Sequence, residues 1–236
     1  MPTNKSLIDA IDKGKRIIIF AFSLKEVTEK AIKNILYLIL KRYNKDDLFD
    51  SIHSVLFESL MNCIKANAKR IFFEENNLNI DDKEDYIIGI KLFKDEINNK
   101  KLKYYGDKAR VKNISIKIIF THSELGLKIE MLNNTKIIRE EDRRIRAKLE
   151  KGEKYLNLFD YYNDNADPTE GEGLGLVLSL LMLKSEGVDT SNFRIGCKNG
   201  ITRTRLEVPF SSKYITERKD YKMKSESKGE KRSKTD

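Results

Sequence analysis

The chain has 236 residues, of which 39% are hydrophobic and 35% charged, so it is long enough to bury one sizeable core. Its formal net charge is +9, and residues 211–236 carry nine Lys and Arg against five Asp and Glu. The apolar run 17–22 is short for a signal peptide, and the run 31–40 is interrupted by polar residues. We therefore expect a soluble, cytoplasmic protein without a membrane span.

The two cysteines, Cys63 and Cys197, do not have the spacing of metal ligands. Cys63 falls in a helical pattern and Cys197 in a strand pattern. Both are therefore predicted to be buried free thiols, which fits a reducing compartment.

The N-terminal part, residues 1–47, is predicted to contain one strand and one apolar helix. Residues 16–22 are β-branched and aromatic, which is typical of a short strand. Ser23 lies three residues before Glu26, which is a capping-box pattern at the start of a helix. The helix over residues 24–40 is so apolar that either the domain or a second copy of the chain must cover it. We expect it to be a docking or dimerisation element.

A second helix is predicted over residues 48–72, with apolar positions recurring at the helical period. Glu58, Asn62 and Lys65 lie between these positions, and their spacing places them on one stripe of the helix. A carboxylate, an amide and an ammonium group on one stripe could hold a metal-bound polyphosphate. The alternative is an ordinary solvated helix face with a hydrogen bond between residues four apart.

Residues 76–112 are polar, and we interpret them as a partly mobile insertion with one short element. The segments 114–120 and 125–131 alternate with a period of two and predict a β-hairpin joined by residues 121–124. A highly charged helix is predicted at 138–153, followed by an aromatic, loop-like segment.

Residues 170–176 read EGEGLGL and open into a strongly apolar helical run. Glycine lets the backbone pass close to another group, and the free N–H groups of a first helical turn attract anions. The run therefore favours a phosphate site, although a glycine-rich turn without a ligand is the alternative.

Two final strands are predicted at 192–198 and 202–208, joined by an Asn199-Gly200 turn. The basic tail, residues 211–236, has almost no apolar residues and is predicted to be disordered. Its basic residues are mixed with acids and it has one aromatic beyond Tyr214, so nucleic acid is not an expected partner.

This order of motifs over residues 48–210 resembles the GHKL ATPase domain of histidine kinases, anti-sigma kinases, type II topoisomerases and heat-shock-90-type chaperones. The likeness is greatest to the first two. It implies an α/β (α+β) fold, a two-layer sandwich of a mixed β-sheet and helices known as the Bergerat-type ATP-binding fold. An N-terminal helix, the insertion at 76–112 and the tail would be additions to it.

The family's N box, E-x-x-x-N-x-x-K, matches at Glu58, Asn62 and Lys65. The resemblance implies that Asn62 is a Mg²⁺ ligand and that Lys65 contacts phosphate. It also implies that Glu58 orients or activates the attacking group. ATP and Mg²⁺ are therefore the expected cofactors.

Two further boxes have counterparts near the C-terminal end. The G2 box, G-x-G-L-G-L, matches at Gly171, Gly173, Leu174, Gly175 and Leu176. The closing strand of the kinases is approximated by Gly200, Thr202, Leu206 and Pro209, and the resemblance places the Thr202 hydroxyl near the adenine. Phe159 resembles the aromatic residue of the kinase F box.

The G1 box, D-x-G-x-G, is replaced by Asn133-Asn134-Thr135. In the family its aspartate accepts a hydrogen bond from the adenine amino group. The Asn133 oxygen can accept the same bond, but exchanging a charged acceptor for a neutral one forfeits about 1 kcal/mol.

Neither histidine has the surroundings of a kinase phosphoacceptor; His53 is expected at the helix surface or core edge. The expected function is that of a stand-alone ATP-binding domain, either an ATPase or a signalling kinase that acts on a separate protein. The alternative is a degenerate, non-catalytic module that senses a nucleotide or binds a protein.

Overall fold

The computed structural model describes residues 4–97, 99–157, 159–161 and 174–232. Its strands form a five-stranded sheet in the order β1-β2-β3-β5-β4. Their bounds are Ile17–Ala21 (β1), Ile116–Ser123 (β2), Gly126–Asn133 (β3), Phe193–Lys198 (β4) and Ile201–Pro209 (β5). The chain is thus an α+β protein. The prediction of a mixed sheet is wrong, because every neighbouring pair of strands is antiparallel and two of the pairs are tight hairpins.

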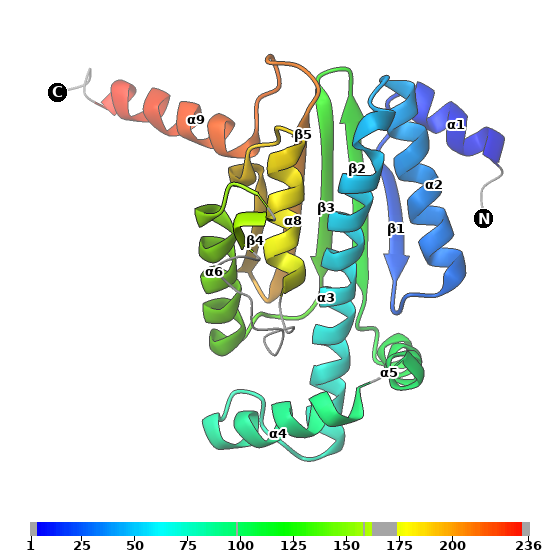
Figure 1. Cartoon of the computed structure of the whole chain (residues 1–236), viewed down its shortest axis with the longest axis vertical. Coiled ribbons are helices and arrows are strands. Elements are labelled where there is room, and N and C mark those ends of the chain that lie inside the picture. Colours follow the sequence, from blue (N-terminus) through cyan, green and yellow to red (C-terminus); the bar gives the residue numbers. More distant parts are fainter. Residues whose placement is uncertain (1–3, 98, 158, 162–173, 233–236) are drawn as a thin grey trace.

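The described α-helices pack mainly in a layer beside this sheet (Figure 1). Their bounds are Asn4–Asp12 (α1), Glu26–Arg42 (α2), Phe49–Glu75 (α3), Lys83–Glu96 (α4), Asn99–Val111 (α5), Arg139–Lys154 (α6), Leu174–Ser185 (α8) and Glu217–Arg232 (α9). Short 3₁₀ turns occupy Asp46–Leu48 and Thr190–Asn192. Helices α2, α3 and α8 lie along one face of the sheet, and α6 packs beside α8. In the described part of the chain, no helix combines the length and apolar character that crossing a membrane requires.

The predicted alternation in the hairpin decides which side chains meet the helices. Leu127, Ile129 and Met131 of β3 are buried on one face, where they join the main hydrophobic core with residues of α2, α3 and α8. Thr204 is the cross-strand neighbour of Met131, so β5 presents its even-numbered residues to the same core. Asn133 continues this inward face at the end of β3.

Both predicted hairpins are confirmed, with one difference in length. Asn199 and Gly200 have φ values of 52° and 77°, which suits the two-residue turn that their sequence predicts. Ser123 pairs with Gly126, so the first hairpin has a two-residue connection that is shorter than expected. His122 consequently lies within β2 rather than in the connection.

Helix α2 is covered by its own domain. Its buried apolar residues, which all belong to the main core, are Ile32, Ile35, Leu36, Ile39 and Leu40. The face that prompted the expectation of a partner is therefore already occupied. The predicted capping box is wrong, because α2 begins after Lys25 without a side-chain cap. Ser23 packs instead against Gly106 of α5, where an added Cβ would lie 2.3 Å from the Ser23 Cβ.

The insertion at 76–112 contains two helices, α4 and α5, rather than one short element. They pack on the C-terminal end of α3 through a second hydrophobic cluster. In it the Phe72 ring meets the rings of Phe93 and Tyr105 edge-on, with ring centroids 5.5 and 6.5 Å apart. Gly89 of α4 lies so close to the Phe73 ring that a side chain would not fit. The apolar run at 86–93 indicates one element, but the few apolar residues of 99–111 stand among charged and polar ones, so the sequence pattern did not reveal α5.

The basic tail contains helix α9, so the prediction of disorder is wrong for this part. The helix is anchored by Glu217 in its first turn, whose carboxylate lies 2.5 Å from Arg203 and 3.2 Å from Lys128 and also pairs with Arg205. These cations belong to β3 and β5. The anchor combines residues far apart in sequence, so tail composition alone could not reveal it.

The Glu217 anchor should be sensitive to acid. Burial opposes ionisation of this carboxyl, but the hydrogen bonds from Arg203 and Lys128 outweigh it and lower its pKa to about 2. An unfolded glutamate has a pKa of about 4.3. The stabilisation is therefore complete above pH 4.3 and is lost as the pH falls toward 2. The backbone amides of α9 should lose protection from hydrogen exchange over this range, after correction for the intrinsic effect of pH on exchange.

A variant pair checks the assignment at neutral pH. Glu217→Gln should accelerate trypsin cleavage after Arg218 because it removes the anchoring charge. Asp220→Asn should leave the rate unchanged, because the Asp220–Lys224 pair is exposed and contributes little. Equal rates in the wild type and Glu217→Gln would contradict the anchor.

Candidate functional site

Glu58 and Asn62 form a pair in the middle of α3. The Asn62 Nδ2 donates a hydrogen bond to Glu58 Oε1 at 3.1 Å, as their spacing of four residues predicts. Lys65 lies three residues further along, and both Asn62 and Lys65 are exposed. The three side chains are thus accessible from one side of α3.

Gly175, the second residue of α8, lies directly against Glu58. A Cβ at this position would be 2.0 Å from Glu58 Oε1 and 2.2 Å from its Cδ, so any side chain here would displace the Glu58 carboxylate. The N–H groups in the first turn of α8 have no acceptor within the helix, and the helix dipole favours negative charge there. The geometry brings together two motifs that are far apart in the sequence. Taken alone, the same contact also suits a carboxylate that stabilises the start of α8.

Asn133 and Thr202 are cross-strand neighbours at one end of the sheet. Asn133 is 2% exposed, and within the described residues its Oδ1 has no hydrogen-bond partner. The Thr202 backbone N–H and hydroxyl both donate to the Thr135 carbonyl, at 3.2 and 2.6 Å. The two residues that the resemblance assigns to the adenine are therefore adjacent on the inward face.

The segment after β3 is held by a side chain where the family has glycines. The Asn134 Oδ1 accepts from the Ser115 N–H at 2.7 Å, and its Nδ2 donates to the Asn113 carbonyl at 2.7 Å. These bonds fix the chain to the residues that precede β2. Such a segment has less freedom to move than a glycine-rich one.

Part of the predicted site lies outside the described residues. Gly171 and Gly173 are in this part, so the structure places only Leu174, Gly175 and Leu176 of the predicted phosphate-binding run. Phe159, expected to resemble the F-box aromatic, is 72% exposed.

Sequence reasoning missed a polar stripe on the face of α3 that packs on the sheet. We call Ser59, Cys63 and Asn67 the polar seam; all three are buried, one helical turn apart. Ser59 and Thr204 line a small cavity between α3 and the sheet. Burial raises the pKa of the Cys63 thiol to about 12, although a hydrogen bond with Thr204 opposes the shift. Polar residues at i, i+4 and i+8 on an apolar helix face are the signal that could have revealed the seam.

The exposure of the two thiols differs from expectation in one case. Cys63 is buried as predicted, whereas Cys197 is exposed. Cys197 lies near the end of β4, which is an edge strand of the sheet. A strand pattern does not show which strand lies at the edge.

A buried charge cluster joins α3 to the start of α6. Arg70 and Lys69 both pair with the Glu141 carboxylate, and the Arg70–Glu141 distance is 2.8 Å. All three side chains are at most 14% exposed. Arg70 also donates to the Lys136 carbonyl, in the segment that follows β3. The cluster therefore positions this segment against α3.

Lys184 closes the C-terminal end of α6 from the end of α8. Its Nζ donates to the carbonyls of Gly152 at 3.1 Å and Glu153 at 2.9 Å, and also to that of Tyr155. Carbonyls at the end of a helix lack partners within the helix and attract cations. Helices α6 and α8 are thus joined at this end as well as along their sides.

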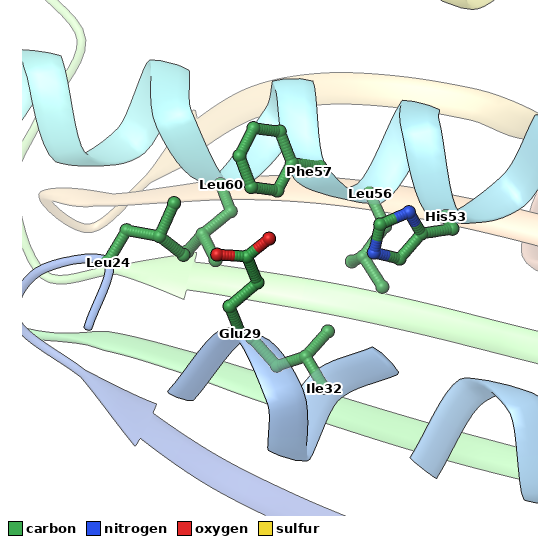
Figure 2. A pocket seen from close by; sticks show the side chains of 7 residues that line it. All are labelled: Leu24, Glu29, Ile32, His53, Leu56, Phe57 and Leu60. Carbon is green, nitrogen blue, oxygen red and sulfur yellow. The ribbon is translucent and has the colours of Figure 1, made fainter. Parts of the chain in front are cut away.

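Both histidines contact other groups of the protein in ways that stabilise the fold. His53 stacks on Phe49 with ring centroids 5.5 Å apart, and burial lowers its pKa, aided by Lys33. Figure 2 shows it beside a small pocket between α2 and α3, lined by Leu24, Glu29, Ile32, His53, Leu56, Phe57 and Leu60. This pocket is mainly apolar and offers few groups for a phosphate.

His122 is buried within β2. Its Nε2 faces the Lys15 carbonyl at 3.1 Å and must donate to it, so Nδ1 accepts from the Tyr43 hydroxyl at 2.9 Å. Both ring nitrogens of His122 are therefore occupied.

The residues of the site suit a Mg²⁺ ion that arrives with a polyphosphate. In the described part of the chain, no three His, Cys, Asp or Glu side chains gather to hold a metal ion by themselves. Asn62 uses its amide nitrogen to bind Glu58, so its oxygen is the atom available to a cation. Mg²⁺ prefers oxygen ligands and commonly takes most of them from phosphate and water.

Comparison with known proteins gives one relative of unknown activity. The chain is 30% identical over 200 residues to an uncharacterized protein of Treponema pallidum (strain Nichols). The match covers 85% of this chain and 39% of the relative, so the chain spans about two fifths of that protein's length. No protein-family model and no solved structure matches the chain.

Proposed function

We propose that the chain is an ATP-binding domain of the GHKL type. The observation that carries the proposal is the contact between Glu58 and Gly175, since it joins the counterparts of the N box and the G2 box. The Asn62–Glu58 hydrogen bond and the inward position of Asn133 support it. An α+β fold with helices on one face of an antiparallel sheet is compatible with the proposal. The proposal keeps the two-layer arrangement of the Bergerat-type fold but not its mixed sheet, since the described strands all pair antiparallel.

In this proposal the site residues of α3 and α8 have separate roles. The backbone at Gly175 approaches the phosphates closely because no side chain intervenes, and Lys65 adds positive charge. Asn62 offers its amide oxygen to Mg²⁺, which would supply charge neutralisation for phosphoryl transfer. Glu58 lies next to both groups, where a carboxylate can orient an attacking hydroxyl or water.

The proposal includes a separate acceptor for any phosphoryl group. His122 has both nitrogens engaged, and His53 is stacked between aromatic rings of its own helix. Transfer would therefore be to water or to another protein. Such a partner needs a surface other than the buried face of α2. The protein would work in the cytoplasm, where ATP is available and free thiols persist.

Titration calorimetry of ATP with Mg²⁺ tests the proposal directly, together with phosphate release. We expect micromolar binding and slow, Mg²⁺-dependent turnover. Glu58→Gln keeps an oxygen for the Asn62 bond but removes the charge, so it should retain binding and lower turnover by roughly 10²–10⁴-fold. The control is Glu186→Gln, which alters a carboxylate that bonds Ser51 outside the site. Absence of binding up to millimolar ATP would contradict the proposal.

The pinned segment after β3 favours a second candidate, a non-catalytic module that binds a nucleotide or a protein. Asn134 fixes this segment through two hydrogen bonds, and the charged acceptor of the family is missing at Asn133. Nucleotide binding without turnover, in the wild type as in Glu58→Gln, would select this candidate. Turnover that depends on Glu58 would exclude it.

A further inference from the structure

Two buried polar atoms at one end of the polar seam have no hydrogen-bond partner among the residues that the structure describes. They are the Asn67 Nδ2 on α3 and the Asn133 Oδ1 on β3, at 1% and 2% residue exposure. Within the described residues neither atom is within bonding geometry of a partner. A buried polar group without a partner is costly, so such groups usually have a protein, water or ligand partner. One of the two atoms is a donor and the other an acceptor.

The two asparagines are linked through a single hydrogen-bonded group of residues. The Thr135 hydroxyl donates to Asn67 Oδ1 at 3.1 Å, which leaves the Asn67 nitrogen as the unused atom. The Thr135 carbonyl binds Thr202, and Thr202 is the cross-strand neighbour of Asn133. Both asparagines therefore belong to the space between α3 and the inward face of the sheet.

A buried donor on α3 and a buried acceptor on the facing strand β3 together match a ligand edge with the opposite pattern. Adenine has such an edge, because its exocyclic amino group donates and the adjacent ring nitrogen N1 accepts. Hypoxanthine and guanine show the reverse, with a carbonyl acceptor beside an N1–H donor. An edge of the wrong pattern would leave both asparagine atoms unpaired, which strongly disfavours it.

We propose that the Asn67 Nδ2 donates a hydrogen bond to the adenine ring nitrogen N1. The adjacent amino group of adenine donates to the Asn133 Oδ1. This inference rests on the proposed nucleotide site and adds a residue that sets base specificity. It assigns discrimination between adenine and 6-oxopurines to the side-chain amide of Asn67. The Thr135 hydroxyl is a positioning group, since it holds the Asn67 oxygen.

Base analogues test the inference on the unmodified protein by calorimetry. 1-Deaza-ATP lacks the N1 acceptor and should bind about tenfold more weakly than ATP. Purine riboside triphosphate lacks the amino group and should lose a similar factor. Inosine triphosphate reverses both positions and should bind at least 100-fold more weakly. Equal affinity of ATP and 1-deaza-ATP would overturn the role of Asn67.

The variant Asn67→Leu completes a double-mutant cycle between the side chain and the ligand atom. It should bind ATP about tenfold more weakly than the wild type does, with no further loss for 1-deaza-ATP. Ser59→Ala is the matched control, because it removes another buried polar group from the same face of α3 but keeps Asn67, so it should keep the preference of the wild type for ATP over 1-deaza-ATP. A tenfold loss for 1-deaza-ATP that persists in Asn67→Leu would overturn the proposal. If Asn67→Leu does not fold, the analogue series still decides.

Failure of this inference differs from failure of the nucleotide site. If no nucleotide binds, the proposed function fails and the specificity proposal fails with it. If all purine triphosphates bind with the same affinity, the site stands and Asn67 does not read the base. In that case a buried water is the partner of its nitrogen.

Discussion

Gly175→Ala should destabilise the fold by no more than about 1 kcal/mol and lower ATP affinity at least about tenfold. The new Cβ would overlap the Glu58 carboxylate, which lies 2.0 Å from its position. Either α8 or Glu58 must move, and Asn62 then loses its hydrogen-bond partner. Urea unfolding measures the first effect and calorimetric titration of ATP the second.

Gly196 provides the matched control for this substitution. It lies on β4, and a Cβ there would meet no atom within 4 Å. Gly196→Ala should therefore leave both unfolding and ATP affinity close to those of the wild type. Gly175→Ala with unchanged stability and affinity would show that the contact with Glu58 is neither tight nor functional.

Glu141→Ala should destabilise the protein by about 3–5 kcal/mol, since it leaves Lys69 and Arg70 buried without their shared carboxylate. Burial opposes ionisation of Glu141, but the neighbouring charges of Lys69 and Arg70 prevail and hold its pKa below the usual range. The stabilisation is therefore present above the pKa of an unfolded glutamate and is lost as the pH falls through the lowered value. Unfolding midpoints in urea at neutral and acidic pH measure both effects.

A second variant separates charge burial from a general loss of packing. Replacing all three residues by apolar ones, as Lys69→Met, Arg70→Leu and Glu141→Leu, should recover most of the stability because no unpaired charge remains. A loss below 1 kcal/mol in Glu141→Ala would contradict the cluster's role. In the triple variant, stability as low as in Glu141→Ala would do the same.

The sequence supported predictions wherever a local pattern determines the structure. The Asn199-Gly200 turn, the alternating residues of β3 and the spacing of Glu58 and Asn62 all depend on neighbours within a few positions. These features are found as expected. The approach of Gly175 to Glu58 joins distant segments, and it was predictable only through the order of motifs in a known family.

Features that depend on distant partners were missed or misinterpreted. The tail forms α9, whose Glu217 anchor is held by cations on β3 and β5, which composition does not show. Helix α5 packs through Tyr105 and Gly106, isolated residues in a polar segment. The burial of Asn67 could not be predicted from the sequence, because it depends on the distance from α3 to the sheet.

Helix α3 belongs to both hydrophobic clusters, and this affects how the protein opens locally. Its 27 residues extend about 40 Å, from the main core through Glu58 and Asn67 to the aromatic cluster around Phe72. Because α3 is one continuous helix, unfolding of either of its ends would weaken the packing of the cluster at the other end. The backbone amides near Ile52 and Ile71 should therefore exchange with deuterium at closely similar rates, as members of one cooperative unit. The insertion and the candidate site thus share a single structural support.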